Sequence, residues 1–384
     1  MPRQHRANTC PRRVGLDIGS HTLKAVEVVE RGPEIVIRAA GAVALPVTEG
    51  SHQPPDHSTT VHAIRALWSA ARFQSGKVIL ALPPEALYIK WLHLEASDRE
   101  ALDMTARTAA VRGAPFAPDD AIVDYRVLAS RGTLSSNVYF VMLVAASATA
   151  VDSLLNAAEA AGLEPVAVDV GSTAVLRCLD TRRRAAGFLW SGQPIAHCIV
   201  GARNTTIAVV RSGEMEFART VPVGGNDFTE CVADHLAVSW SEAEKIKGTP
   251  GNRLVAGGSL IASHGNEEVR VPCENVVGRL AREIQRSLRF FASQFAEGSY
   301  LGMIGGMTLS GGGALMKGLD TCLEEQGIDV AGVINPFAGL SVDGEAGLQQ
   351  IGDTAAQYSV AMGLALGDYW SSGVGRAAEA ELAA

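Results

Sequence analysis

The sequence is poor in the patterns that mark several classes of protein. Its six cysteines contain no CxxC pair, and its nine histidines form no HxxxH or HExxH pattern. We therefore expect neither a disulfide framework nor a zinc site. The longest apolar run, residues 138–151, falls short of the roughly 20 apolar residues of a membrane-spanning helix. The basic residues at the start, MPRQHRANTCPRR, are followed by no apolar core, so we predict no secretory signal.

Positive charge is also scarce. The 33 Lys and Arg residues are outnumbered by 41 Asp and Glu residues, and a net charge of −8 argues against a nucleic-acid binder with a broad basic surface. Neither the P-loop patterns GxxxxGKS and GxxxxGKT nor the dinucleotide pattern GxGxxG occurs. Hydrophobic residues make up 47% of the chain, which is enough to fill real cores, and 384 residues predict two to three domain-sized units.

Glycine is the residue in excess, at 40 residues or about a tenth of the chain, against a usual share of roughly 7%. Three glycine turns each follow a predicted strand, at residues 17–22 (DIGSHT), 200–206 (VGARNTT) and 310–314 (SGGGA). Glycine lets backbone N–H groups approach an anion closely, and Ser and Thr add donors. We expect a helix to start after Gly313 and to direct its positive end at a ligand. Together the three turns predict a phosphate-binding site.

Two distant segments share one pattern. VGLDIGSHTLKAVEVV and HCIVGARNTTIAVVRS both predict a strand, a glycine turn and a strand, and Gly19 and Gly201 are 182 residues apart. A third strand follows each, so we predict a duplicated β-meander. Residues 77–168, with a capping box at 97–100, predict an inserted α+β unit with its own core. Residues 274–295 predict a long amphipathic helix, and residues 355–366 a closing helix.

Six segments carry a family resemblance, and they occur in this order: DIGSHTLKAVEV, APFAPDDAIVDYRVL, MEFARTVPVGGNDFT, SEAEKIK, LSGGGALMKGL and YSVAMGLALG. In order and spacing they resemble the PilM family of type IV pilus assembly proteins, within the actin-like ATPase superfamily. The resemblance covers roughly residues 14–367. It implies an α/β fold of the actin-like, two-lobed, ribonuclease-H-like kind, with an inserted α+β subdomain and with ATP in the cleft between the lobes.

The resemblance implies a division of the chain into five parts. They are residues 1–76, the first half of lobe I with the basic leader; 77–168, the inserted subdomain; 169–194, the return to lobe I and the crossover; 195–354, lobe II; and 355–384, a C-terminal helix that returns to lobe I, with a tail.

The resemblance also implies which residues hold ATP and Mg²⁺. Asp17 would lie near Mg²⁺ through water, and Lys24 would reach a phosphate from the strand after the first turn. The other implied contacts are Gly19, Ser20, His21 and Thr22 at the phosphates; Gly201, Ala202, Asn204 and Thr205 in a second phosphate turn; Glu244 and Lys247 at the ribose and base; and Gly311, Gly312, Gly313 and Ala314 in the adenosine turn.

Several of these residues also have an ordinary structural interpretation. Asp17 can be the polar end of a strand, and Lys24 can be a solvated strand residue. Glu244 lies three residues after Ser241 and can complete a capping box. Three further residues beside the turns are expected to shape a helix entry or to lie in solvent: Gly224, Gly225 and Arg203.

Two positions depart from the pattern of actin-like ATPases, whose second phosphate turn usually begins with an aspartate. The aligned residue, two before Gly201, is Ile199, and an apolar side chain cannot hold a metal-bound water. The hydrolytic Gln or Glu of actins precedes an Ala-Val-Leu run, and here Thr173, a poor base, precedes the run at 174–176. We therefore predict nucleotide binding with slow or absent hydrolysis, and we assign no catalytic residue.

The function that the resemblance implies is a cytoplasmic scaffold of the type IV pilus machinery, peripheral to the inner membrane. An apolar groove between lobe I and the inserted subdomain would take the cytoplasmic tail of a PilN-like inner-membrane protein. Other pilus assembly proteins and self-association are further candidate interactions. Neither nucleic acid nor direct membrane contact is expected.

Other functions of the same fold stay open. A GspL-like secretion protein would continue into a transmembrane segment, and an FtsA-like division protein would end in a basic amphipathic helix, unlike the tail GRAAEAELAA. A scaffold that has lost nucleotide binding would keep the same fold. A sugar or acetate kinase needs a carboxylate base, for which Asp169 and Asp227 are the only nearby candidates.

Overall fold

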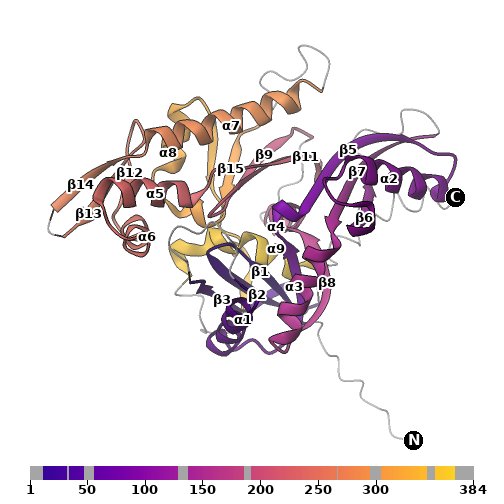
Figure 1. Cartoon of the computed structure of the whole chain (residues 1–384), viewed down its shortest axis with the longest axis horizontal. Coiled ribbons are helices and arrows are strands. Elements are labelled where there is room, and N and C mark those ends of the chain that lie inside the picture. Colours follow the sequence, from indigo (N-terminus) through magenta and orange to yellow (C-terminus); the bar gives the residue numbers. More distant parts are fainter. Residues whose placement is uncertain are drawn as a thin grey trace, which may run out of the picture.

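The computed structural model describes residues 12–32, 34–46, 56–128, 137–185, 192–265, 267–294, 304–343 and 351–367. Most of the basic leader, the end of the predicted helix at Phe295 and the tail after residue 367 lie outside the described residues. Figure 1 shows two lobes and a projecting third sheet grouped around a centre.

The first lobe is built on a six-stranded sheet. Its strands, in their order across the sheet, are β17 (Ser341–Val342), β3 (Glu34–Ala44), β2 (Thr22–Arg31), β1 (Arg12–Ile18), β4 (Lys77–Leu82) and β8 (Glu164–Val170). β1, β2 and β3 form the predicted antiparallel meander, and β4 and β8 continue the sheet parallel to β1. Residues 23–29 of β2 are all buried, since helices cover both faces of the sheet.

Four α-helices of the described part of the chain belong to this lobe. They are α1 (His57–Ala71), α3 (Ala148–Ala160), α4 (Gly171–Ala185) and α9 (Ser359–Ala365). α1 and α3 pack against one face of the sheet through an apolar core around Leu16, Ile64 and Leu80. α9 packs against β1 and against α4 on the other face. α9, the last described helix, thus packs within the first lobe.

The second lobe repeats this arrangement. Its sheet has the order β11 (Glu214–Val221), β10 (Thr205–Arg211), β9 (Ile195–Val200), β15 (Met307–Ser310) and β16 (Val330–Val333). The first three strands are an antiparallel meander, and β15 and β16 are parallel to β9. This order matches β3-β2-β1-β4-β8 strand for strand, so the predicted duplication is confirmed.

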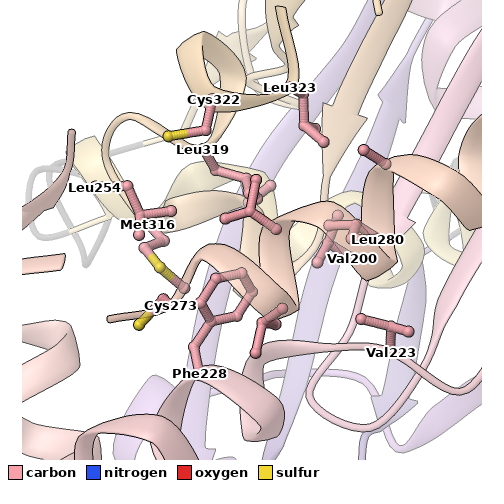
Figure 2. Packing of buried hydrophobic residues seen from close by; sticks show 14 of the residues in the cluster. Val200, Val223, Phe228, Leu254, Cys273, Leu280, Met316, Leu319, Cys322 and Leu323 are labelled. Carbon is pink, nitrogen blue, oxygen red and sulfur yellow. The ribbon is translucent and has the colours of Figure 1, made fainter. Parts of the chain in front are cut away.

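One large apolar core holds the second lobe together. Around it lie the helices α5 (Gly225–Leu236), α6 (Trp240–Gly248), α7 (Glu274–Ala292) and α8 (Leu319–Glu325) and the hairpin sheet β12 (Arg253–Leu254), β13 (Ser259–His264) and β14 (Glu267–Pro272). Figure 2 shows Phe228 of α5, Leu280 of α7 and Leu319 of α8 in this core, together with Met316, which precedes α8. α7 is amphipathic as predicted, and its buried residues include Ile284.

The third sheet is narrower than the predicted unit of residues 77–168. Among the described residues, it contains β5 (Leu87–Glu95), β7 (Val138–Ser147) and β6 (Ala121–Val127), in that order, with α2 (Arg99–Gly113) packed on one face. β4 and β8, which begin and end the predicted unit, instead pair within the first sheet. The opposite face of the third sheet packs against β10 and β11 of the second lobe.

Two local predictions are wrong. α2 is capped by Asp98, whose side chain accepts a hydrogen bond from the N–H of Ala101, and not by a box that begins at Ser97. After the third glycine turn the chain forms a short 3₁₀ turn, η3 (Gly312–Leu315), and the α-helix begins only at Leu319. No strong helix dipole is therefore directed from Gly313 into the cleft. Among the described residues, no helix combines the length and apolarity needed to cross a membrane.

Candidate functional site

The three glycine turns meet at one cavity. It has a volume of about 990 Å³, and its walls come from the first lobe, the second lobe and the start of β5. Fourteen of the sixteen predicted ligand-binding residues line it: Asp17, Gly19, Ser20, His21, Thr22, Lys24, Gly201, Ala202, Asn204, Glu244, Lys247, Gly311, Gly312 and Gly313. The fold thus brings together residues that are up to about 300 positions apart in the sequence.

Thr205 and Ala314 do not line the cavity. Thr205 is fully buried, and its hydroxyl donates a hydrogen bond to the backbone oxygen of Val223 at 2.7 Å. Ala314 belongs to the core of the second lobe. Conversely, Arg203 lines the cavity although it was expected to lie in solvent, and Gly225, which begins α5 as expected, lines the cavity as well.

The first turn has a paired charge at its base. The register of β1 and β2 sets Asp17 opposite Lys24, and the Lys24 ammonium lies 3.2 Å from Asp17 Oδ2. Lys24 is only 9% exposed, so it is not a solvated strand residue. Gly19 makes the turn tight enough that a Cβ there would lie 2.8 Å from the backbone oxygen of Thr22.

The second turn repeats the backbone of the first without its charges. The N–H of Gly201 donates to the oxygen of Asn204 at 2.9 Å, and a Cβ at Gly201 would lie 2.8 Å from that same oxygen. In place of the Asp17–Lys24 pair, the strand register sets Ile199 opposite Thr206. Both of these side chains line the cavity, so the departure noted in the sequence faces the site itself.

The conformation of the third turn requires glycine at two positions. A Cβ on Gly311 would lie 2.4 Å from the oxygen of Val200, and one on Gly313 would lie 2.5 Å from a Val200 methyl group. Gly311 also has a φ of +90°. A Cβ on Gly312 would meet no atom within 4 Å, so this glycine faces open space in the cavity.

Glu244 belongs to a partly buried network and is not a helix cap. α6 is capped by Ser239, which excludes the predicted capping box at Ser241. Glu244 Oε2 accepts from Thr229 at 2.5 Å and from Lys247 at 2.6 Å. Lys247 also donates to Thr229 at 2.6 Å and to the backbone oxygen of Gly225 at 3.0 Å. All three donors of the Lys247 ammonium therefore have protein partners, which hold the ammonium beside Glu244.

Glu244 also approaches the first turn, because its Oε1 lies 3.7 Å from His21 Nε2. Burial lowers the pKa of His21, the Lys247 and Lys24 cations lower it further, and Glu244 only partly opposes them. Burial alone would raise the pKa of Glu244, but the charge and hydrogen bond of Lys247 outweigh it and lower the pKa. At neutral pH the cleft therefore holds an ionised Glu244 beside a neutral His21.

Glu85 is one of the cavity-lining residues that the sequence prediction did not include. Glu85 lies on the 3₁₀ turn η1 (Pro84–Ala86) between β4 and β5, and its carboxylate accepts a hydrogen bond from the side-chain amide of Asn204. The pair joins the start of the third sheet to the second glycine turn. The segment LPPEA signals a turn through its two prolines, but nothing local predicts a partner 119 residues away.

The two carboxylates considered as a kinase base have other partners. Asp169 forms an ion pair with Arg177 and accepts from Thr173 at 2.9 Å. Asp227 accepts from the N–H of Gly224 at the start of α5 and pairs with Arg279. Neither carboxylate lines the cavity. In the described part of the chain, no group of three or more His, Cys, Asp or Glu side chains is placed to hold a metal ion.

Two duplicated lobes around a glycine-lined cleft define an actin-like protein. The family model for type IV pilus assembly protein PilM matches residues 15–369, and the chain belongs to this family. The structure titled "PilM-PilN type IV pilus biogenesis complex" is similar with a TM-score of 0.74 and 26% identity, over 92% of this chain and 97% of that chain.

Two other relatives are more distant. Cell division protein FtsA of Bacillus subtilis (strain 168) is 23% identical over 186 residues, which are 46% of this chain and 40% of the length of FtsA, so the chain spans less than half of that relative. MreB5 of Spiroplasma citri bound to AMPPNP has a TM-score of 0.48 and 14% identity, over 96% of this chain and 98% of that chain. That likeness is too distant to assign a ligand.

Proposed function

We propose that this chain binds an adenine nucleotide in the cleft between its lobes and serves as a scaffold of type IV pilus assembly. The observation that carries the first part is the convergence of three glycine turns on one cavity of about 990 Å³. The first two turns offer backbone N–H groups and hydroxyls to phosphates, with Lys24 at the base of the first. The third turn offers open space at Gly312 for the adenosine.

The residues present fit a nucleotide better than they fit a bare metal ion. Asp17 Oδ2 faces Lys24, and within the described residues Asp17 Oδ1 has no hydrogen-bond partner, so it can hold a water of Mg²⁺. The second turn adds no carboxylate of its own, because Ile199 occupies that position. Mg²⁺ would therefore be held mainly by the phosphates and, through water, by Asp17, and it would neutralise phosphate charge there.

Calorimetry with ATP and Mg²⁺ tests the site. We expect micromolar binding by the wild type and binding at least tenfold weaker by Gly312→Asp, which places a carboxylate in the third turn. The substitution is suitable because a Cβ at Gly312 meets no atom within 4 Å. The matched control is Gly76→Asp, at an exposed loop position outside the cavity whose Cβ is equally unobstructed. No binding by the wild type would contradict the proposal and favour a scaffold without a ligand.

We further propose that hydrolysis is slow or absent. The Thr173 hydroxyl donates to Asp169 and to the oxygen of Val170 at 2.7 Å, and Thr173 does not line the cavity. Ile199 cannot orient a metal-bound water. A steady turnover near one ATP per second that Asp17→Ala abolishes would refute this part of the proposal.

The partner that we propose is the cytoplasmic tail of a PilN-like inner-membrane protein, which would hold the chain at the membrane from the cytoplasmic side. The likeness to the PilM–PilN complex supports this partner, because it covers 92% of the chain at 26% identity. Fluorescence polarisation with a labelled N-terminal peptide of a PilN-like protein tests it, with a scrambled peptide as the control. The absence of binding at saturating peptide would sink the assignment. No observation favours the kinase, because its two candidate bases are engaged elsewhere.

A further inference from the structure

The carboxylate of Glu85 already sits where the second turn presents a donor. The Asn204 amide, which belongs to this turn, donates to Glu85 Oε1, and both residues line the cavity. The backbone of the turn does not need this contact, because it is closed by the Gly201–Asn204 hydrogen bond. The Asn204 side chain is therefore free to exchange one oxyanion for another.

Glu85 lacks the cationic partner that two other carboxylates of the cavity, Asp17 and Glu244, have. Asp17 is neutralised by Lys24, and Glu244 by Lys247. Within the described part of the chain, Glu85 forms no ion pair, and its hydrogen-bond partner is a neutral amide. A phosphate group that reached the second turn would meet this uncompensated negative charge, and two like charges at contact distance repel each other.

Glu85 is also tied to the third sheet. β5 begins at Leu87, two residues further on, and its Trp91 donates from Nε1 to the backbone oxygen of Met215 in β11 at 2.7 Å. Ile89 and Trp91 pack with Met215 in one apolar cluster. β5 is thus held to the second lobe at two places, by the Glu85–Asn204 contact and by the contact with β11, and Figure 1 shows the two strands approaching each other.

We propose that Glu85 is a built-in competitor of phosphate at the second turn, so that nucleotide binding releases Glu85 and loosens the third sheet from the second lobe. The inference rests on the proposed nucleotide site and adds how that site is regulated. The coupling is reciprocal: whatever holds β5 against β11 favours the Glu85–Asn204 contact and weakens nucleotide binding, and nucleotide weakens the β5–β11 contact.

Calorimetry on Glu85→Gln tests the competition. The substitution keeps the shape and a hydrogen-bond acceptor but removes the charge. We expect ATP with Mg²⁺ to bind about fivefold more tightly, which corresponds to roughly 1 kcal/mol for one charge pair near water. Adenosine, which has no phosphate, should bind equally to both proteins. The control is Glu95→Gln at the other end of β5, an exposed position outside the cavity, which should leave both affinities unchanged.

Amide hydrogen exchange tests the release. On adding ATP to the wild type, exchange should rise in residues 87–92 and 214–217. In Glu85→Gln, whose uncharged amide accepts a weaker hydrogen bond from Asn204, exchange there should be raised in part without ATP. Unchanged or weaker ATP binding by Glu85→Gln, with a wild type that binds, overturns the inference alone. If neither protein binds ATP, the proposed function fails and the inference fails with it. Binding by Glu85→Gln alone supports the competition by Glu85 but contradicts the proposed function, because the wild type then binds no nucleotide.

Discussion

Replacing Lys247 by Met should destabilise the fold and should do so through Glu244. The Lys247 side chain is 12% exposed and that of Glu244 27%, so the pair lies in a partly desolvated environment. Met keeps the aliphatic stem but leaves the carboxylate without its cation and removes three donated hydrogen bonds. Removing one partner of a buried pair destabilises a protein by about 3 kcal/mol or more, because an uncompensated charge remains.

The double variant Lys247→Met/Glu244→Gln is the control for this mechanism. It contains no unpaired charge, so we expect it to recover about 2 kcal/mol relative to the single variant. Urea unfolding at pH 7, followed by circular dichroism, measures both free energies. A loss below 1 kcal/mol in the single variant, or a double variant no more stable than the single one, would refute the reasoning.

The pH dependence of the free energy of unfolding tests the same mechanism independently. In the wild type the pKa of Glu244 is lowered from 4.5, so the stability it contributes is present above that value and is lost as the pH falls through the folded-state pKa. In Lys247→Met the charge and hydrogen bond of the lysine are gone, so we expect burial to raise the pKa of Glu244 above its ordinary value of 4.5. The difference in stability between the two proteins should therefore shrink between pH 7 and about pH 4.5. A difference that stays constant over this range would exclude Glu244 as its cause.

Two further predictions concern the frame around the cleft. Burial lowers the pKa of His197 to about 3, so between pH 6 and pH 4 the unfolded chain takes up this proton and the folded chain does not. Over this range the free energy of unfolding of the wild type should therefore fall by about 1.4 kcal/mol per pH unit more than that of His197→Gln. Urea unfolding at each pH measures both slopes, and equal slopes would contradict the assignment. Gly363→Ala should destabilise the protein by about 3 kcal/mol or more in thermal or urea unfolding, because its Cβ would lie 1.8 Å from the oxygen of Ala174 where α9 meets α4, whereas Gly352→Ala, whose Cβ meets nothing within 4 Å, should change little.

The meanders of both lobes were predictable because their signals are local. Each strand is a short apolar run, and each glycine turn follows its strand directly. The limits of the inserted sheet were not predictable from the sequence. β4 and β8 are apolar runs like other strands, and only the strands they pair with assign them to the first sheet. Pairing between distant strands leaves no mark in the local pattern.

The site shows the same division. Of the sixteen residues that the resemblance implied, fourteen line one cavity, but the set included Thr205 and did not include Thr206. Alternation along β10 separates the two, because successive side chains of a strand point to opposite faces, so that Thr206 faces the cavity and Thr205 the core. Applied to the strand after each glycine turn, this rule would have corrected the prediction. Glu85 had no such rule, because its role depends on a partner from the other lobe.

The duplication also bears on what the cleft is suited to do. Gly19 and Gly201 hold the same tight backbone, each leaving 2.8 Å for a Cβ against the facing oxygen, so both turns can present N–H groups to an anion. Their side chains diverge at one register position, where the first hairpin pairs Asp17 with Lys24 and the second pairs Ile199 with Thr206. Phosphate binding depends mainly on the backbone that is kept, whereas activation of water depends on the carboxylate that is missing. This asymmetry therefore favours the nucleotide binding that we propose, together with its proposed coupling to the third sheet, over cleavage of the nucleotide.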